Sequence, residues 1–414
     1  MSPTPRPTPP AEGDPREAAA LATLLDLLAS PESTAPVLAV LGRPGASSTA
    51  TMLASLLGAL GLTTGALLSP HLQDPRERIR VAGSPIEAEE LTARSAELAP
   101  VLAEVETRHA RALSVPASLA AVAAAHFADA PVDVVIVEVT AATRVLVERA
   151  GPSVLAVPLP VRPAAAAQAV DLLAAGTVAV CGSQATAATL AAPAGRQGGR
   201  VVTAAEPASR RLAVGGQQLD LVGTTAGVSD VYVPLHGAHQ AAHAALALSA
   251  LEAFLGFAGG LDPAFLREGF AATRLPGRLE VVRRQRGATV LLDLADDGAT
   301  GGALAAALAE EFAVRNRVVV LGADPQTDVG PLLQALLPAA EHVILTPADP
   351  LRPVELTGAR EAAQAAGVHA ETAVDVAAAL GLADGLVGEE DAVVVTGSAA
   401  AVGAARDALA LPVT

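Results

Sequence analysis

The feature that most constrains the fold is an expected strand, glycine-rich turn and helix in immediate succession near the N-terminus. Val37 to Leu41 is a short apolar run of the kind that forms a buried parallel strand. The turn Gly42 to Thr49 follows, and a helix is expected from about Ala50 to Leu60, with Ser48 or Thr49 suited to its N-cap. This order of elements is typical of a phosphate-binding loop.

The loop lacks its usual cation, because Ala46 stands where a phosphate-binding loop carries lysine. All 27 cationic residues of the chain are arginines, so a lysine from elsewhere cannot replace it. A cation about 4 Å from a phosphate is worth roughly 4 kcal/mol at an effective dielectric constant near 20. Arg43 could supply charge, but its place beside Gly42 differs from that of the lysine. Three interpretations stay open: an ATP-hydrolysing loop, a weak nucleotide or anion site, and an inherited structural turn.

Charge and composition exclude several classes of function. The formal net charge of -16 would repel a phosphate backbone, so we do not expect a nucleic-acid partner. Cys181 is the single cysteine, which excludes an internal disulfide. The proline-rich N-terminus does not resemble a signal peptide, and polar residues interrupt apolar stretches such as Ala117 to Val139. We therefore expect a cytoplasmic protein without membrane contact.

Alternating strands and helices predict an α/β fold with two parallel sheets. The clearest buried strand, Val132 to Val139, carries a carboxylate, Glu138, near its end. The predicted organisation is a flexible extension and helix (1–35), a large P-loop domain (36–286) and a smaller Rossmann-like C-terminal domain (287–414), with the boundary near Arg286.

Several short motifs occur in an order that resembles one known family. They are the loop at Gly42, Ser69-Pro70-His71-Leu72 with Glu77-Arg78-Ile79-Arg80, Glu138-Val139 with Arg144 downstream, Gly237-Ala238-His239-Gln240, Pro276-Gly277-Arg278-Leu279-Glu280 with Asp293 beyond it, and Thr396-Gly397-Ser398. From about Pro36 to Val413 the chain resembles the folylpolyglutamate synthase/dihydrofolate synthase family of the Mur ligase superfamily. The resemblance implies a Mur-ligase-like P-loop domain followed by a Rossmann-like domain.

The resemblance also implies a reaction and a set of site residues. In the family's reaction ATP phosphorylates a carboxylate, and the amino group of glutamate then displaces the phosphate, which requires ATP and Mg²⁺. The implied positions are Gly42, Gly45, Ala46, Ser47, Ser48 and Thr49 in the nucleotide loop, Ser69 and Glu138 for magnesium, Arg278 and Asp293 for nucleotide at the domain junction, and His71, Arg78, Arg144 and His239 in other family loops.

The chain departs from the family pattern at several of its motifs. Besides Ala46 in the loop, the asparagine of GxHQxxN is His243, and the histidine and asparagine of DGAHNP are Asp296 and Asp297, which we expect to cap the following helix. The family's segment with a magnesium-ligating histidine aligns with residues 158–164, where its polar residues are lost.

These losses predict a catalytically degenerate homologue with a binding or regulatory role. Its ligand would be nucleotide-like or folate-like, or it would bind a protein partner. The alternative is an active ATP-dependent ligase that adds L-glutamate to folate or dihydropteroate.

Overall fold

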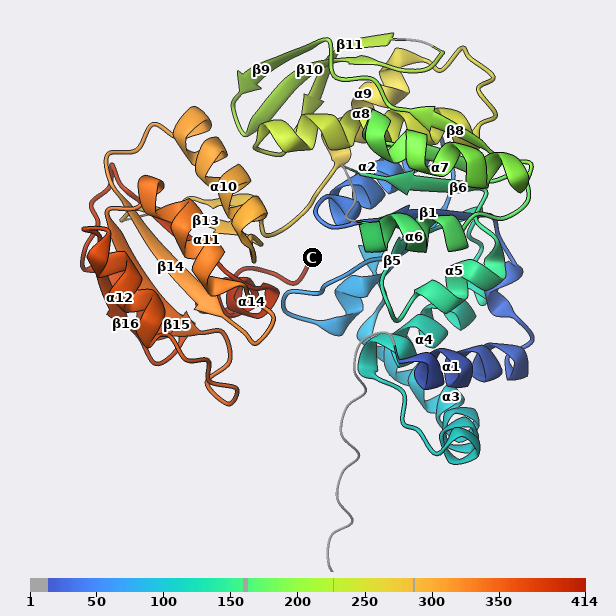
Figure 1. The fold of residues 1–414 in the computed structure, drawn as a ribbon, viewed down its shortest axis with the longest axis horizontal. Helices are drawn as coiled ribbons and strands as arrows, with labels where there is room; N and C mark the ends of the chain where they lie inside the picture. The colour runs from blue at the N-terminus through green and yellow to red at the C-terminus, as the bar shows by residue number, and fades with distance from the viewer. Residues whose placement is uncertain (1–13, 159–162, 226, 286) are drawn as a thin grey trace, which may run out of the picture.

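The computed structural model describes residues 14–158, 163–225, 227–285 and 287–414, and it shows two α/β domains (Figure 1). The predicted fold class is confirmed: each domain is built on a largely parallel sheet with helices on both faces. Residues 1–13, which make up most of the predicted flexible extension, lie outside the described residues, whereas the helix expected after the extension is present as α1 (Pro15–Leu27).

The N-terminal domain is organised around an eight-stranded sheet. In sheet order its strands are β4 (Ser84–Pro85), β3 (Ile79–Val81), β2 (Thr64–Leu67), β5 (Val134–Val139), β1 (Val37–Leu41), β6 (Val154–Val157), β7 (Val178–Cys181) and β8 (Arg200–Thr203). The pairs from β2 to β8 are parallel, and β3 and β4 extend one edge in antiparallel orientation. The predicted strand at residues 37–41 is therefore confirmed at the centre of the sheet.

Helices cover both faces of this sheet because its central strands are apolar on both sides. In β1, Leu38 and Val40 belong to one core and Val37, Ala39 and Leu41 to the other, as the alternation of a strand requires. The first core also contains α2 (Ala46–Ala59), α8 (Ala238–Phe254) and α9 (Pro263–Ala272). The second contains α1, α3 (Ala88–His109), α4 (Val115–Asp129), α5 (Arg144–Ala150), α6 (Pro163–Asp171) and α7 (Gln184–Arg196), and two 3₁₀ turns, η1 (Pro31–Ser33) and η2 (Pro75–Arg78), lie in its connections.

A small antiparallel sheet lies over α8, as Figure 1 shows. It consists of β9 (Ser209–Ala213), β10 (Gly216–Val222) and β11 (Gly227–Val233), in the order β11-β10-β9. β10 pairs antiparallel with both neighbours, and β9 forms one edge of the sheet.

The C-terminal domain contains a six-stranded sheet in the order β12 (Arg278–Val282), β13 (Thr289–Asp293), β17 (Ala392–Thr396), β14 (Arg317–Ala323), β15 (His342–Pro347) and β16 (His369–Thr372). One face is covered by α10 (Gly298–Glu311), α11 (Val329–Leu336), η3 (Leu337–Ala339) and α12 (Thr357–Ala365), and the other by α13 (Val376–Asp384) and α14 (Ala399–Ala408). Residue 286, the predicted boundary, lies outside the described residues. Because β12 precedes it and already belongs to this sheet, we propose a boundary ahead of Arg278.

The two domains touch on both sides of the cleft between them. Glu311 of α10 accepts a hydrogen bond from Arg210 of β9 and lies 2.8 Å from Nδ1 of His236. On the other side, Arg406 of α14 donates to the side chain of Gln73 at 2.8 Å. Among the helices in the described ranges, none is long and apolar enough to cross a membrane.

Candidate functional site at the domain junction

The glycine loop passes directly from β1 into α2. The helix begins at Ala46, with Gly45 in the N-cap position, so the prediction of a start near Ala50 with a Ser48 or Thr49 cap was wrong. The physical reason is the backbone conformation of the two glycines, with φ of 125° at Gly42 and 106° at Gly45. These positive φ values complete the turn by Gly45, so the helix begins at the next residue. The two hydroxyl residues consequently lie within the first turn of the helix and are buried.

Two features of the structure require glycine at position 45: its backbone conformation and the nearby ring of His243. A Cβ atom added there would lie 2.3 Å from Cε1 of His243, whose ring packs beneath the loop from α8. Burial lowers the pKa of His243 to about 3, with smaller contributions from His239 and Arg278, and lowers the pKa of His239 to about 4. Both imidazoles are therefore neutral at pH 7 and add no positive charge to the loop.

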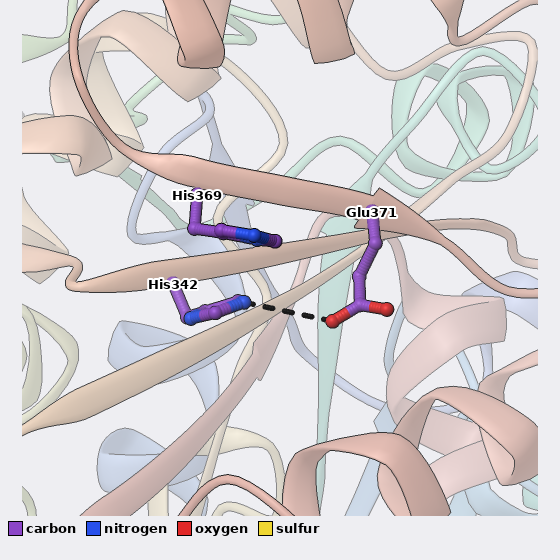
Figure 2. Close-up of side chains that lie close together, drawn as sticks. All are labelled: His342, His369 and Glu371. Atoms are coloured by element: carbon purple, nitrogen blue, oxygen red, sulfur yellow. Dashed lines mark ion pairs between the residues drawn. The ribbon is translucent and has the colours of Figure 1, made fainter.

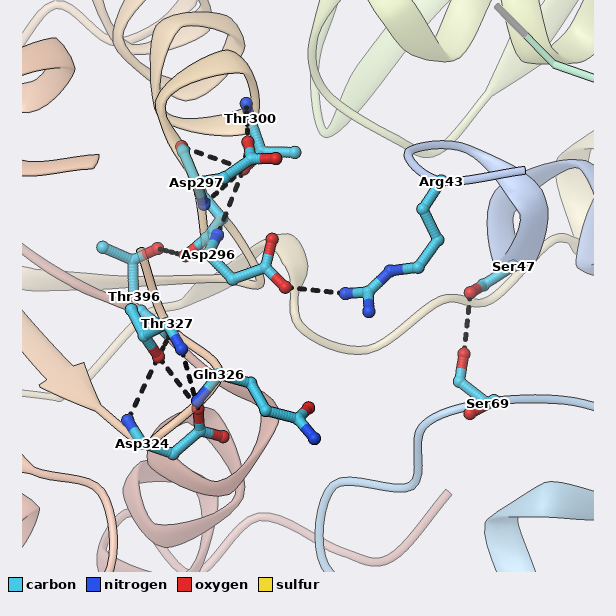
Figure 3. Close-up of polar contacts among 12 residues, drawn as sticks. Arg43, Ser47, Ser69, Asp296, Asp297, Thr300, Asp324, Gln326, Thr327 and Thr396 are labelled. Carbon is cyan, nitrogen blue, oxygen red and sulfur yellow. Dashed lines mark hydrogen bonds and ion pairs between the residues drawn. The ribbon is translucent and has the colours of Figure 1, made fainter. Parts of the chain in front are cut away.

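Three oxygen-bearing residues meet beside the loop, and Figure 3 shows Ser47 and Ser69 facing one another. Ser47 Oγ lies 2.9 Å from the backbone carbonyl oxygen of Ser69 and 3.2 Å from Oε1 of Glu138. The Ser69 backbone N–H donates to Oε2 of Glu138 at 2.9 Å. Burial raises the pKa of Glu138, and the bonds from Ser69 and Ser47 partly oppose that effect. Hydroxyl, carbonyl and carboxylate oxygens are the donors that Mg²⁺ prefers, so these residues fit a magnesium ion.

The loop has alanine, Ala46, at the position of the expected lysine, and among the described residues the cations that line the cleft with it are Arg43 and Arg278. Ala46 is buried and lines the cleft without any polar group. Arg43 extends away from the loop, and its Nη2 lies 2.7 Å from Oδ2 of Asp296 in the other domain (Figure 3). The Arg43 side chain is 72% exposed and so is held at the mouth of the cleft.

Arg278 and Asp293 are opposite one another in β12 and β13, and their contact with nucleotide stays a prediction. Burial lowers the pKa of Arg278, and the neighbouring Asp293 opposes that effect. Burial also raises the pKa of Asp293 to about 6, against the influence of Arg278 and of backbone N–H donors at Leu279 and Ala295. The positive charge of Arg278 is therefore partly neutralised by the carboxylate of Asp293 in the same domain.

The aspartates that replace the family's histidine and asparagine have separate roles. Asp297 is the N-cap of α10 and accepts a 2.8 Å bond from the Thr300 backbone N–H, which confirms the capping prediction for this residue. Asp296 instead pairs with Arg43 across the cleft and lines the cavity between the domains. Its negative charge opposes the approach of an anion.

A cavity of about 500 Å³ joins these groups between the domains. Its charged lining residues are the arginines Arg43 and Arg278 and the carboxylates Glu138, Asp296, Asp297 and Asp328. The sequence did not single out Asp328, Gln168 or Gln326, which also line it. Gln326 follows the carboxyl end of β14, and polar residues at that position were the available signal.

Several predicted site residues lie outside this cavity. Arg144 pairs with Glu148 and Asp171 and lines a separate cavity of about 280 Å³. The Arg78 side chain donates to His71 Nδ1 at 2.8 Å and lies 3.3 Å from the hydroxyl of Ser69, so it supports the loop that carries the oxygen donors. The predicted loss of a magnesium-ligating histidine falls at 158–164, of which 159–162 lie outside the described residues.

Comparison with known proteins identifies the family. The model of the Mur ligase, glutamate ligase domain matches residues 277–399. A dihydrofolate synthase/folylpolyglutamate synthase of Mycobacterium tuberculosis is 37% identical over 362 residues, covering 79% of this chain and 73% of that protein. A probable bifunctional folylpolyglutamate synthase/dihydropteroate synthase of Haloferax volcanii is 30% identical over 410 residues, covering 92% of this chain and 47% of that protein.

A solved structure of the same fold supports this result. The M. tuberculosis folylpolyglutamate synthase complexed with ADP matches with a TM-score of 0.88 and 33% identity, over 96% of both chains. Together with the motif order and the cleft geometry, these matches show that the chain belongs to the folylpolyglutamate synthase/dihydrofolate synthase family of Mur ligases.

Proposed function

We propose that this protein is a catalytically degenerate member of its family. It retains the cleft between the two domains but does not carry out efficient ATP-dependent glutamate ligation. Its role would be that of a binding or regulatory homologue. Relatives of known structure are complexed with ADP and with AMPPCP, and we extend to this chain only a weak interaction with magnesium nucleotide in the same cleft.

The observation that carries the proposal is the loss of the loop's lysine: among the described residues, the cations that line the cleft are Arg43 and Arg278, and each lies beside an aspartate. Ala46 occupies the lysine position, and Arg43 is paired with Asp296 rather than free to contact phosphate. A missing contact of roughly 4 kcal/mol corresponds to about three decades in rate or affinity. Among the described residues, the four carboxylates that line the cleft outnumber its two arginines, so the net negative charge adds repulsion that a bound metal ion would offset.

One observation favours the alternative of an active ligase. The oxygen donors of Ser47, Ser69 and Glu138 converge beside the loop, so the chain's own residues can hold Mg²⁺ and present it to a phosphate. The ion would neutralise phosphate charge there, whereas the buried Glu138 would orient Ser47 and the Ser69 backbone. The metal ligands alone do not replace a cation that contacts the transferred group.

The test is a calorimetric titration of ATP with Mg²⁺ into the natural protein and an Ala46→Lys variant. We expect dissociation constants above about 100 μM, or binding weaker than about -5.5 kcal/mol, for the natural protein. The variant should bind at least about tenfold more tightly, because a side chain at this position faces the cleft. Gly58→Lys adds the same charge at an exposed position of α2 and should leave affinity unchanged. Tight magnesium-dependent binding by the natural protein would contradict the proposal and favour the ligase.

A further inference from the structure

Two histidines and a glutamate meet at one edge of the C-terminal sheet, as Figure 2 shows. His342 is the first residue of β15, and the parallel register places it opposite His369 of β16. Glu371 lies two residues beyond His369, so its side chain emerges on the same face of the sheet. The strand register, rather than a flexible loop, brings the three side chains together.

The distances between these side chains suit a single metal ion. The nitrogen and oxygen atoms that could act as ligands all lie within 4.8 Å of one another. His342 Nε2 is 3.5 Å from Glu371 Oε1, and the two imidazole rings stack with centroids 4.3 Å apart and an interplanar angle of 29°. Two ligands about 2.1 Å from a tetrahedral ion are about 3.4 Å apart, so small side-chain rotations complete the geometry.

A second observation indicates an unfulfilled contact at this position. His342 Nε2 is buried and has no hydrogen-bond partner among the described residues, although Glu371 lies nearby. A buried polar atom without a partner costs free energy, which a bound metal ion would recover. His369 is exposed, so the group is accessible from solvent.

We propose that His342, His369 and Glu371 bind a divalent transition-metal ion of the zinc class, with water completing its coordination. Two imidazoles and one carboxylate select a borderline ion such as Zn²⁺ over Mg²⁺, which requires oxygen ligands. None of these residues lines the cleft at the domain junction, so the site is distinct from the candidate nucleotide site. Its effect would be to link the edge strand β16 to β15 and stabilise that edge.

The experiment uses the full chain without an affinity tag, titrated with Zn²⁺ in competition with a chromophoric chelator. We expect one tight site per chain and no comparable affinity for Mg²⁺. Loss of a residue that only supports a metal ligand already lowers metal affinity by about 10- to 100-fold. His369 and Glu371 are proposed as ligands themselves, so His369→Ala and Glu371→Gln should each weaken binding by at least about tenfold.

A matched control is available in the N-terminal domain. His126 Nδ1 also lies 3.5 Å from a glutamate oxygen, that of Glu90, but among the described residues this pair belongs to no group of three possible metal ligands. His126→Ala should therefore bind Zn²⁺ as the natural protein does. Far-UV circular dichroism without metal checks that each variant is folded, and Zn²⁺ should raise the melting temperature of the natural protein but not that of His369→Ala. Binding weaker than about 100 μM, or equal affinity in the His369 and Glu371 variants, would overturn the proposal.

Discussion

Replacement of Gly45 by alanine tests the geometry of the loop, because two independent features of the structure forbid a side chain there. The residue has φ of 106°, a conformation that L side chains rarely adopt. The new Cβ atom would also lie 2.3 Å from Cε1 and 2.7 Å from Nε2 of His243. The ring of His243 is itself buried in α8 and has little freedom to withdraw.

The magnitude follows from adding these two effects. A sparsely populated backbone conformation costs about 1–3 kcal/mol. Extra volume in a packed region costs about 1–3 kcal/mol. We therefore expect Gly45→Ala to lower the free energy of unfolding by about 2–6 kcal/mol, which corresponds to a fall in melting temperature of at least about 4 °C.

The matched control is Gly58→Ala in the same helix. Gly58 is exposed, has an ordinary helical backbone and has no atom within 4 Å of an added Cβ. Alanine should raise helix propensity there and stabilise the protein by up to about 1 kcal/mol. Thermal unfolding followed by circular dichroism compares both variants with the natural protein. A Gly45→Ala protein as stable as the Gly58→Ala protein would refute the described packing of the loop against His243.

The remaining predictions concern charge. Glu311→Ala removes a carboxylate whose side chain is 2% exposed and takes the acceptor from His236 and from the Gly237 N–H, whereas Arg210 keeps Glu310 and Gln217, so we expect a loss of about 1–3 kcal/mol in chemical unfolding. Glu310→Ala, whose side chain is 50% exposed, should change stability by less than about 0.5 kcal/mol, and equal losses would contradict the buried contact. Because the pKa of Asp293 is raised to about 6, the folded protein binds a proton there that the unfolded chain releases near pH 4. Stability should therefore fall as pH rises from about 4 to about 6, and a pH profile of the Asp293→Asn variant should lack this component.

The regular elements of the fold follow from local sequence. The apolar run of residues 37–41 can be buried on both faces, and it forms the central strand β1. The clearest predicted strand, residues 132–139, is found as β5 (Val134–Val139). The start of α2 was misplaced because hydroxyl residues are good N-caps, whereas here Gly45 ends the turn and Ser47 is directed toward Ser69 and Glu138.

The parts of the site that sequence reasoning missed depend on contacts between distant segments. Arg43 reaches Asp296 only because the two domains face one another across the cleft. Arg144, by contrast, lies near the predicted motif in sequence but turns to Glu148 and Asp171. The pair His342 and His369 is created by strand register and carries no local motif.

The most direct test of the central claim is a glutamate-ligation assay on the natural protein. The chain is incubated with ATP, Mg²⁺ and L-glutamate, together with folate or dihydropteroate, and mass spectrometry detects any glutamate adduct. An active M. tuberculosis relative, assayed in parallel, establishes that the conditions support ligation. The account predicts that the natural protein forms adduct at least about a thousandfold more slowly than the relative. Multiple turnovers comparable to those of the relative would show that Ala46 does not abolish catalysis and would contradict the account.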